Sequence, residues 1–125
     1  MLSVVWAPAF VFFLHQVSVW VTNGEYWWDE PMHIAGGMAI AWMGTRLLQV
    51  GREHRRIPEL PQWFTVVVLS GFVMTAGVVW EWYEYIRWIA FDPSMELTLA
   101  DTLKDLVMDA VGGVMVAVYG FRSSI

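Results

Sequence analysis

The chain contains no cysteine among its 125 residues. This absence excludes disulfide bonds, thiolate zinc sites and thiol catalysis, so a bound metal would need histidine, carboxylate, carbonyl or water ligands. Positive charge is also scarce, because seven Lys and Arg residues stand against twelve Asp and Glu residues and leave a net charge of −5. A chain with this balance, and with no long basic stretch interleaved with aromatics, is not expected to bind nucleic acid.

Several catalytic motifs are missing as well. The sequence has no GxSxG nucleophile elbow, no GxxxxGK[ST] phosphate loop and no HExxH helix, and its three histidines are widely separated. These absences argue against a serine hydrolase, a P-loop nucleotidase and a helix-borne zinc protease.

What the chain does have is apolar sequence: 58% of its residues are hydrophobic and nine are Trp. Four segments are long enough, at about 20 helical residues each, to cross a bilayer. Residues 1–22 lack the basic start of a secretory signal, so we expect them to be retained as the first span. The prediction is an all-α integral membrane bundle of four transmembrane helices, forming one domain over residues 1–125, with Asp29 as N-cap of the second helix. The four segments are 2–22, about 30–51, 61–88 and about 98–121.

The basic residues predict the orientation of this bundle. Four of the seven lie in or beside the connection between the second and third segments, namely Arg46, Arg52, Arg55 and Arg56. The positive-inside rule places that connection in the cytoplasm, and with it both termini of a multi-pass inner-membrane protein. The two other connections are acidic and are expected to face outside.

Acidic and histidine side chains recur at helical spacing in three of the four segments. Residues three or four positions apart lie on one face of a helix, so each set is expected to line one face. In the predicted topology all three sets meet at the outer end of the bundle, with the last acid about two turns, or roughly 12 Å, deeper than the first acid of its set. The sets are Asp29 and His33; Glu81 and Glu84; and Asp101, Asp105 and Asp109.

This clustering predicts a divalent-metal site. Several carboxylates in a low-dielectric interior are unfavourable unless protons or cations neutralise them, and carboxylates with one histidine suit Mg²⁺, Mn²⁺, Fe²⁺ or Zn²⁺. The leading hypothesis is a metal-dependent membrane hydrolase acting on a lipid or envelope substrate, with Glu81 or Glu84 as catalytic base. His15 is placed to reach the site as a ligand or as a partner of one. The predicted ligands are Asp29, His33, Glu81, Glu84, Asp101, Asp105 and Asp109.

Other interpretations of the same residues stay open. Asp29 and Asp101 are also typical helix caps, and Glu81, Glu84 and Asp105 are also typical partners for Lys104, Arg87 and water. A cation or proton pathway would use the acids as a relay that continues to the cytoplasm. After Asp109, however, the sequence toward that side is mainly Gly, Val, Met and Ala, which counts against a relay. A structural subunit would use its glycines and tryptophans to pack against a membrane-protein partner or a second copy.

Three motifs, in this order, resemble the YjdF-like family of bacterial inner-membrane proteins, a domain of unknown function. That family has an Asp-x-x-x-His-x-x-x-Gly stretch opening a membrane helix, a Glu-x-x-Glu stretch beside aromatics, and an Asp-Thr-x-x-Asp run ending in two small residues. The resemblance covers roughly residues 26–121 and implies the fold and the site, without a reaction. The matching residues are Asp29, His33 and Gly37; Glu81 and Glu84; and Asp101, Thr102, Asp105, Gly112 and Gly113.

Overall fold

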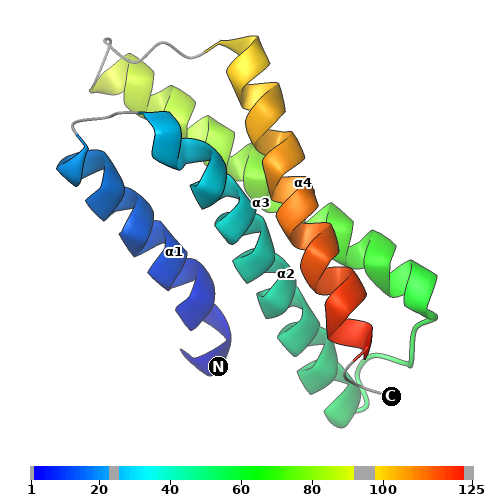
Figure 1. Cartoon of the computed structure of the whole chain (residues 1–125). Helices are drawn as coiled ribbons and strands as arrows, with labels where there is room; N and C mark the ends of the chain where they lie inside the picture. Colours follow the sequence, from blue (N-terminus) through cyan, green and yellow to red (C-terminus); the bar gives the residue numbers. More distant parts are fainter. Residues whose placement is uncertain (1, 23–25, 92–97, 123–125) are drawn as a thin grey trace.

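The computed structural model describes residues 2–22, 26–91 and 98–122, and its long elements are all helices (Figure 1). Within these ranges there is no β-strand, so the all-α prediction is confirmed. A short 3₁₀ helix, which the sequence patterns did not indicate, precedes the second long helix. The elements are α1 (Leu2–Val21), η1 (Tyr26–Trp28), α2 (Asp29–Glu53), α3 (Gln62–Ala90) and α4 (Leu99–Arg122).

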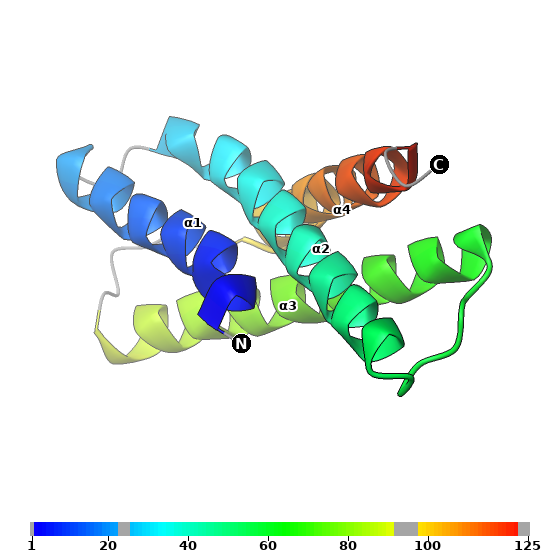
Figure 2. The ribbon, with the colours of Figure 1, turned by 90° about the horizontal axis from the view of Figure 1, so that it is seen from below.

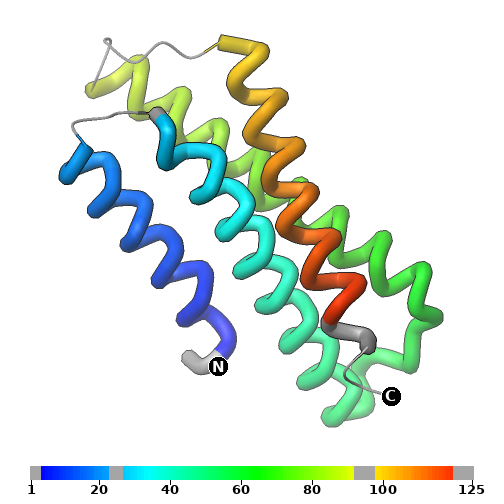
Figure 3. Tube along the Cα trace, in the orientation of Figure 1, coloured from blue at the N-terminus to red at the C-terminus, as the bar shows by residue number. Residues whose placement is uncertain are grey.

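Helix α2 is the centre of the bundle and contacts the three other long helices. Helices α1 and α4 lie on opposite sides of α2, and α3 crosses behind it (Figures 1 and 2). Successive helices run in opposite directions, so the start of α2, the end of α3 and the start of α4 share one end of the bundle (Figure 3). We call this the acidic end, because Asp29, Glu84 and Asp101 belong to these helix ends.

Glycines allow α2 and α4 to approach until their backbones touch. A Cβ atom on Gly37 would overlap the carbonyl oxygen of Asp109, and a Cβ atom on Gly112 would overlap the carbonyl oxygen of Ile34. Small residues permit this kind of approach between membrane helices, because no side chain holds the backbones apart. The contact brings the Asp109 turn of α4 directly against α2.

The start of α2 differs from the prediction. Asp29 is the first residue of the helix rather than its N-cap; Trp28 occupies the cap position and makes no side-chain capping bond. Trp28 already has helical backbone angles, φ −81° and ψ −16°, because η1 runs straight into α2. The expectation that Asp29 caps this helix is therefore wrong, and its carboxylate lies instead near His33, one turn along.

The end of α2 lies two residues beyond the predicted Gly51 and forms a Schellman turn. The Arg56 N–H donates to the Gly51 carbonyl oxygen at 2.8 Å, and the Arg55 N–H donates to the Arg52 carbonyl oxygen at 2.8 Å. Arg55 has a positive φ of 53°, which this motif requires at the residue after the cap. The turn redirects the chain toward α3 at the end of the bundle opposite to the acidic end.

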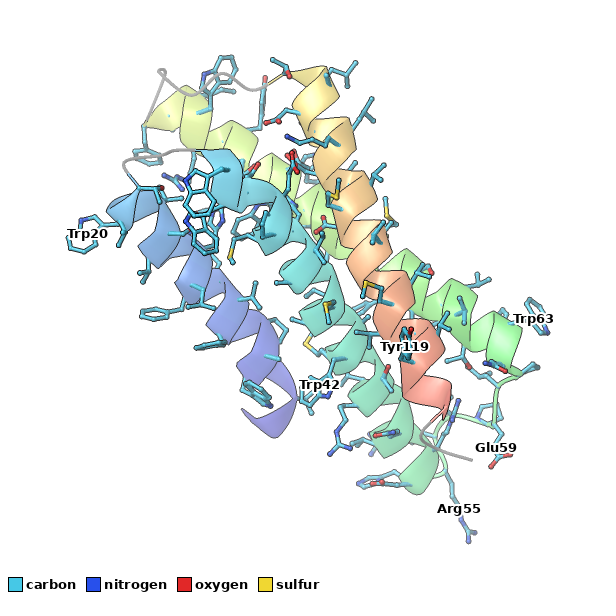
Figure 4. The ribbon with its side chains drawn as sticks, viewed as in Figure 1. Trp20, Trp42, Arg55, Glu59, Trp63 and Tyr119 are labelled. Atoms are coloured by element: carbon cyan, nitrogen blue, oxygen red, sulfur yellow. The ribbon has the colours of Figure 1, made fainter. Side chains whose placement is uncertain are left out.

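The outer surface of the bundle is apolar. Two helical stretches, Val4–Val21 and Gln62–Ala90, are long and apolar enough to cross a membrane, whereas α2 and α4 carry more charge. Phe13 and Val79 point outward with 60% and 57% of their surface exposed. In Figure 4, Trp20 and Trp63 lie at opposite ends of the bundle, as interfacial tryptophans of a membrane protein do.

Candidate functional site

His33 lies at the centre of a buried cluster near the acidic end. It sits one turn into α2 and is only 5% exposed. Its Nε2 atom is 3.7 Å from an Asp29 carboxylate oxygen, as the i, i+4 spacing predicts, and 3.8 Å from an Asp105 carboxylate oxygen on α4. Asp105 is itself 2% exposed, so this pair of helices encloses the side chains from two sides.

The other ring nitrogen of His33 faces Asp109. Its Nδ1 atom lies 3.3 Å from the Asp109 Oδ1 atom, which is hydrogen-bonding distance. Room for this carboxylate comes from Gly77 on α3, where a Cβ atom would lie 2.5 Å from Asp109 Oδ2. The imidazole is thus held between Asp105 and Asp109, which are one turn apart on α4.

Helix α3 contributes two more carboxylates to the same histidine. Glu81 and Glu84 are each 9% exposed. One carboxylate oxygen of each glutamate and one ring nitrogen of His33 form a group in which all atoms lie within 4.8 Å of one another. Asp29, His33 and Asp105 form a second group by the same measure. The two groups share His33, so five side chains from three helices gather around this histidine.

Several atoms of this cluster lack partners. His33 Nε2, Glu81 Oε1 and Asp105 Oδ1 are buried and make no hydrogen bond within the described part of the chain. A buried polar atom left unsatisfied costs about 1–3 kcal/mol, and more when it is charged. The cluster is therefore short of positive charge and of donors, which a cation or protons would supply.

Helix α1 reaches the cluster through His15. This residue is 7% exposed, and its Nε2 atom lies 3.9 Å from Glu84 Oε1. The edge of its ring also packs against Trp80, with 4.9 Å between ring centroids. His15 belongs to neither of the two groups around His33, and its position is that of a neighbour to Glu84.

Asp101 lies outside the buried cluster. Its carboxylate is 2.9 Å from the Lys104 ammonium group, which is also 3.4 Å from Glu30. Lys104 therefore pairs with these two acids at the rim, and no described ion pair joins it to Asp105. Asp101 does not cap α4 either, because its own N–H donates to the Thr98 hydroxyl at 3.1 Å.

Of these two features at the rim, the Thr98 cap had a signal in the sequence and the Glu30–Lys104 pair did not. The Thr98-x-x-Asp101 spacing is a typical helix N-terminus signature, which indicates Thr98 as the cap. The Glu30–Lys104 pair, in contrast, joins two helices whose relative rotation no local pattern specifies.

One protein family model matches almost the entire chain. The family model described as predicted membrane protein (DUF2238), a family of unknown function, covers residues 2–124. No curated protein and no solved structure matches the chain significantly. The match is consistent with the YjdF-like resemblance and spans almost the entire sequence. The chain therefore belongs to the DUF2238 family of predicted membrane proteins.

Proposed function

We propose that this protein is a divalent-metal membrane enzyme whose metal centre is built around His33. The observation that carries the proposal is the convergence of Asp29, His33 and Asp105, whose ligand atoms lie within 4.8 Å of one another. The Nε2 atom of His33 faces these carboxylates without a hydrogen-bond partner among the described residues. A divalent cation at this position would satisfy the imidazole lone pair and neutralise the acids together.

Asp109 supports this proposal as a positioning residue rather than as a ligand. It accepts a hydrogen bond from His33 Nδ1 in the tautomer that leaves the Nε2 lone pair free. Metal-binding histidines commonly have such a carboxylate partner, which fixes the ring orientation and raises its basicity. The proposal assigns one ion, because both acid groups share His33 and its Nδ1 atom is engaged with Asp109.

Glu81 and Glu84 are the proposed source of a general base. Asp29, His33 and Asp105 would hold the ion, which would supply a Lewis acid to the reaction, so one glutamate is free to accept a proton from the attacking water. In the proposed hydrolysis the water oxygen bonds to the phosphoryl or acyl centre of a lipid or envelope substrate. The bond to the leaving oxygen then breaks, and the glutamate returns the proton to that oxygen.

The proposed orientation places the acidic end on the outer side of the cell membrane. The last turn of α2 carries Arg52, and the connection from α2 to α3, at the opposite end of the bundle, carries Arg55 and Arg56. The positive-inside rule assigns this end, and both termini, to the cytoplasm. A substrate would then reach the centre from the outer leaflet or the envelope.

The buried residues beyond the cluster weigh against a cation or proton pathway. Toward the opposite end, the most buried side chains include Leu69, Val73, Ala41 and Ala117, together with Thr65. A relay would need titratable or hydrated groups along that path. The interior of the bundle is therefore polar mainly near the acidic end, which favours a binding centre over a path across the membrane.

Calorimetric titration of the purified, chelator-stripped protein tests the metal centre. We expect Mn²⁺ or Zn²⁺ to bind with one ion per chain, and Asp105→Asn to weaken binding at least about ten-fold, because it removes a charged ligand. Asp101→Asn is the matched control and is expected to bind like the wild type, because Asp101 lies at the rim with Lys104.

Two outcomes would contradict the proposal. The first is that the wild-type protein binds none of the tested divalent ions. The second is that Asp105→Asn and Asp101→Asn lose metal affinity equally, which would indicate non-specific attraction of cations to the acids. The enzymatic part requires a second measurement, the release of phosphate or fatty acid from a panel of membrane lipids. Turnover that depends on metal and is lost in Glu81→Gln or Glu84→Gln is the expected result.

A further inference from the structure

A cavity of about 470 Å³ lies beside the metal-centre residues, between α1, α2 and α3. This volume is within the range of about 300–1,000 Å³ that small-molecule sites occupy. Its lining runs along α1 from Val5 to His15, a distance of about 15 Å at the helical rise. The cavity is thus long and narrow, and it follows the helix axes from the middle of the bundle toward the acidic end.

The wall of this cavity is apolar except at one end. Three of the lining residues, His15, His33 and Asp109, are polar or charged, and all three belong to the buried cluster or contact it. The other lining residues are aliphatic, aromatic, Met, Pro or Gly. They include Val11, Phe12, Ile40, Met43, Ala76 and Trp80.

Helix α1 closes the cavity over only part of its length. The described aromatic and ionic contacts between α1 and α3 are made by Phe12 and His15, which meet Trp80, Tyr83 and Glu84. Toward the start of α1, Val5 and Ala9 line the cavity, and α1 packs there on α2, where Trp6 meets Trp42, rather than on α3. Because the surface around α1 is apolar and the family is one of predicted membrane proteins, we expect the side of the cavity between α1 and α3 to face hydrocarbon.

Water is a poor occupant for such a space. A buried water needs two to four polar partners, and apolar cavities stay dry or bind apolar molecules. A hydrocarbon chain matches the long apolar part, and a polar group attached to it matches the histidine and carboxylate end. The shape and lining of the cavity therefore suit an amphiphile.

We propose that this cavity binds the hydrocarbon chain of a single-chain or lipid amphiphile and presents its polar head to His33 and the neighbouring carboxylates. The chain site stands on the cavity alone; its assignment as a substrate site rests on the proposed metal-dependent function. In that role the wall formed by α1 determines which chains fit, and the cluster acts on the bond next to the head.

Photo-crosslinking with a palmitic acid that carries a diazirine in its chain tests the proposal. Purified protein in detergent is irradiated with the probe, and the modified residues are mapped by peptide mass spectrometry. We expect saturable adducts on cavity residues such as Ile40, Met43 and Ala76, which excess unlabelled palmitic acid suppresses.

Two cavity-filling variants give the sharper comparison. Ala76→Phe fills the cavity from α3 and Val11→Phe fills it from α1, and each is expected to reduce the competable adducts at least about ten-fold by displacing several methylenes. Val79→Phe is the matched control, because Val79 is 57% exposed and does not line the cavity. If one filled variant does not fold, as judged by size-exclusion profile and tryptophan fluorescence, the other decides.

Adducts that appear only on outward residues such as Val79, without competition, would overturn the proposal. So would competable adducts that persist in a folded Ala76→Phe or Val11→Phe protein. Metal binding measured on the same samples separates the two proposals. If His33→Ala binds no metal but is still labelled, the cavity binds the hydrocarbon chain independently of the metal centre. If the wild type binds metal but shows no competable labelling, the metal centre stands and the proposed chain site is wrong.

Discussion

At the scale of single residues, His33 decides what the cluster can do. Its two ring nitrogens face different carboxylates: Nδ1 is 3.3 Å from Asp109, and Nε2 is 3.7 Å from Asp29 and 3.8 Å from Asp105. The shorter contact is the hydrogen bond, and the two longer ones leave space between the atoms. In the proposed centre, Asp109 holds Nδ1 and leaves Nε2 to ligate the cation.

The role of Asp109 is tested by Asp109→Asn. The amide keeps the shape of the side chain but loses the charge that orients and polarises His33, so we expect metal affinity to fall about 10–100-fold while the stoichiometry stays the same. Competition with a chelator of known affinity measures the change. If the variant binds metal as tightly as the wild type, Asp109 does not position His33. If the variant binds no metal, Asp109 is a ligand instead.

At the scale of helices, the contact between α2 and α4 positions the site. Gly37 and Gly112 remove the side chains that would keep these backbones apart, and each glycine lies against a backbone carbonyl of the opposite helix. Asp105 and Asp109 are brought to His33 by this contact. The glycines are thus as much a requirement of the site as the acids are.

The substitution Gly37→Ala tests that statement. Its Cβ atom would overlap the Asp109 carbonyl oxygen, so the helices must separate, and we expect the protein to lose about 1–3 kcal/mol of stability or more together with its metal affinity. Thermal unfolding followed by tryptophan fluorescence measures the first effect. Gly71→Ala is the matched control, because nothing lies within 4 Å of its added Cβ atom, and it is expected to be neutral or slightly stabilising.

The sequence predicted the helices and their local faces well, for clear physical reasons. Long apolar stretches predicted four helices, and the i, i+4 spacing predicted that Asp29 and His33 share a face. Local patterns could not predict the rotation of α4 about its axis, which decides that Asp105 faces Nε2 while Asp109 faces Nδ1. They also could not predict the cavity beside α1, because its volume depends on how three helices cross.

At the scale of the whole molecule, charge is separated along the bundle. The buried acids lie at one end, and the Arg-rich connection, with Arg55 and Glu59 in Figure 4, lies at the other. Membrane insertion favours cytoplasmic arginines, so the acidic end is expected to face outward. The proposed reaction would therefore take place at the outer side of the membrane.

The absence of cysteine makes this orientation easy to test with single cysteines. We expect Leu99→Cys, at the start of α4 and 74% exposed in the wild type, to react with an impermeant maleimide in spheroplasts. Glu59→Cys, in the connection between α2 and α3, is expected to react only after the membrane is opened. The opposite labelling pattern would invert the orientation and leave the fold unchanged.

The metal content of the protein as isolated tests the proposed centre without any assumption about its substrate. The chain is purified in mild detergent without chelator and analysed by elemental mass spectrometry beside His33→Ala, Asp105→Asn and the control Asp101→Asn. We expect about one divalent ion per chain in the wild type and in Asp101→Asn, and little in the other two variants. A folded wild type without metal, even after incubation with Mg²⁺, Mn²⁺ and Zn²⁺, would contradict the proposed centre.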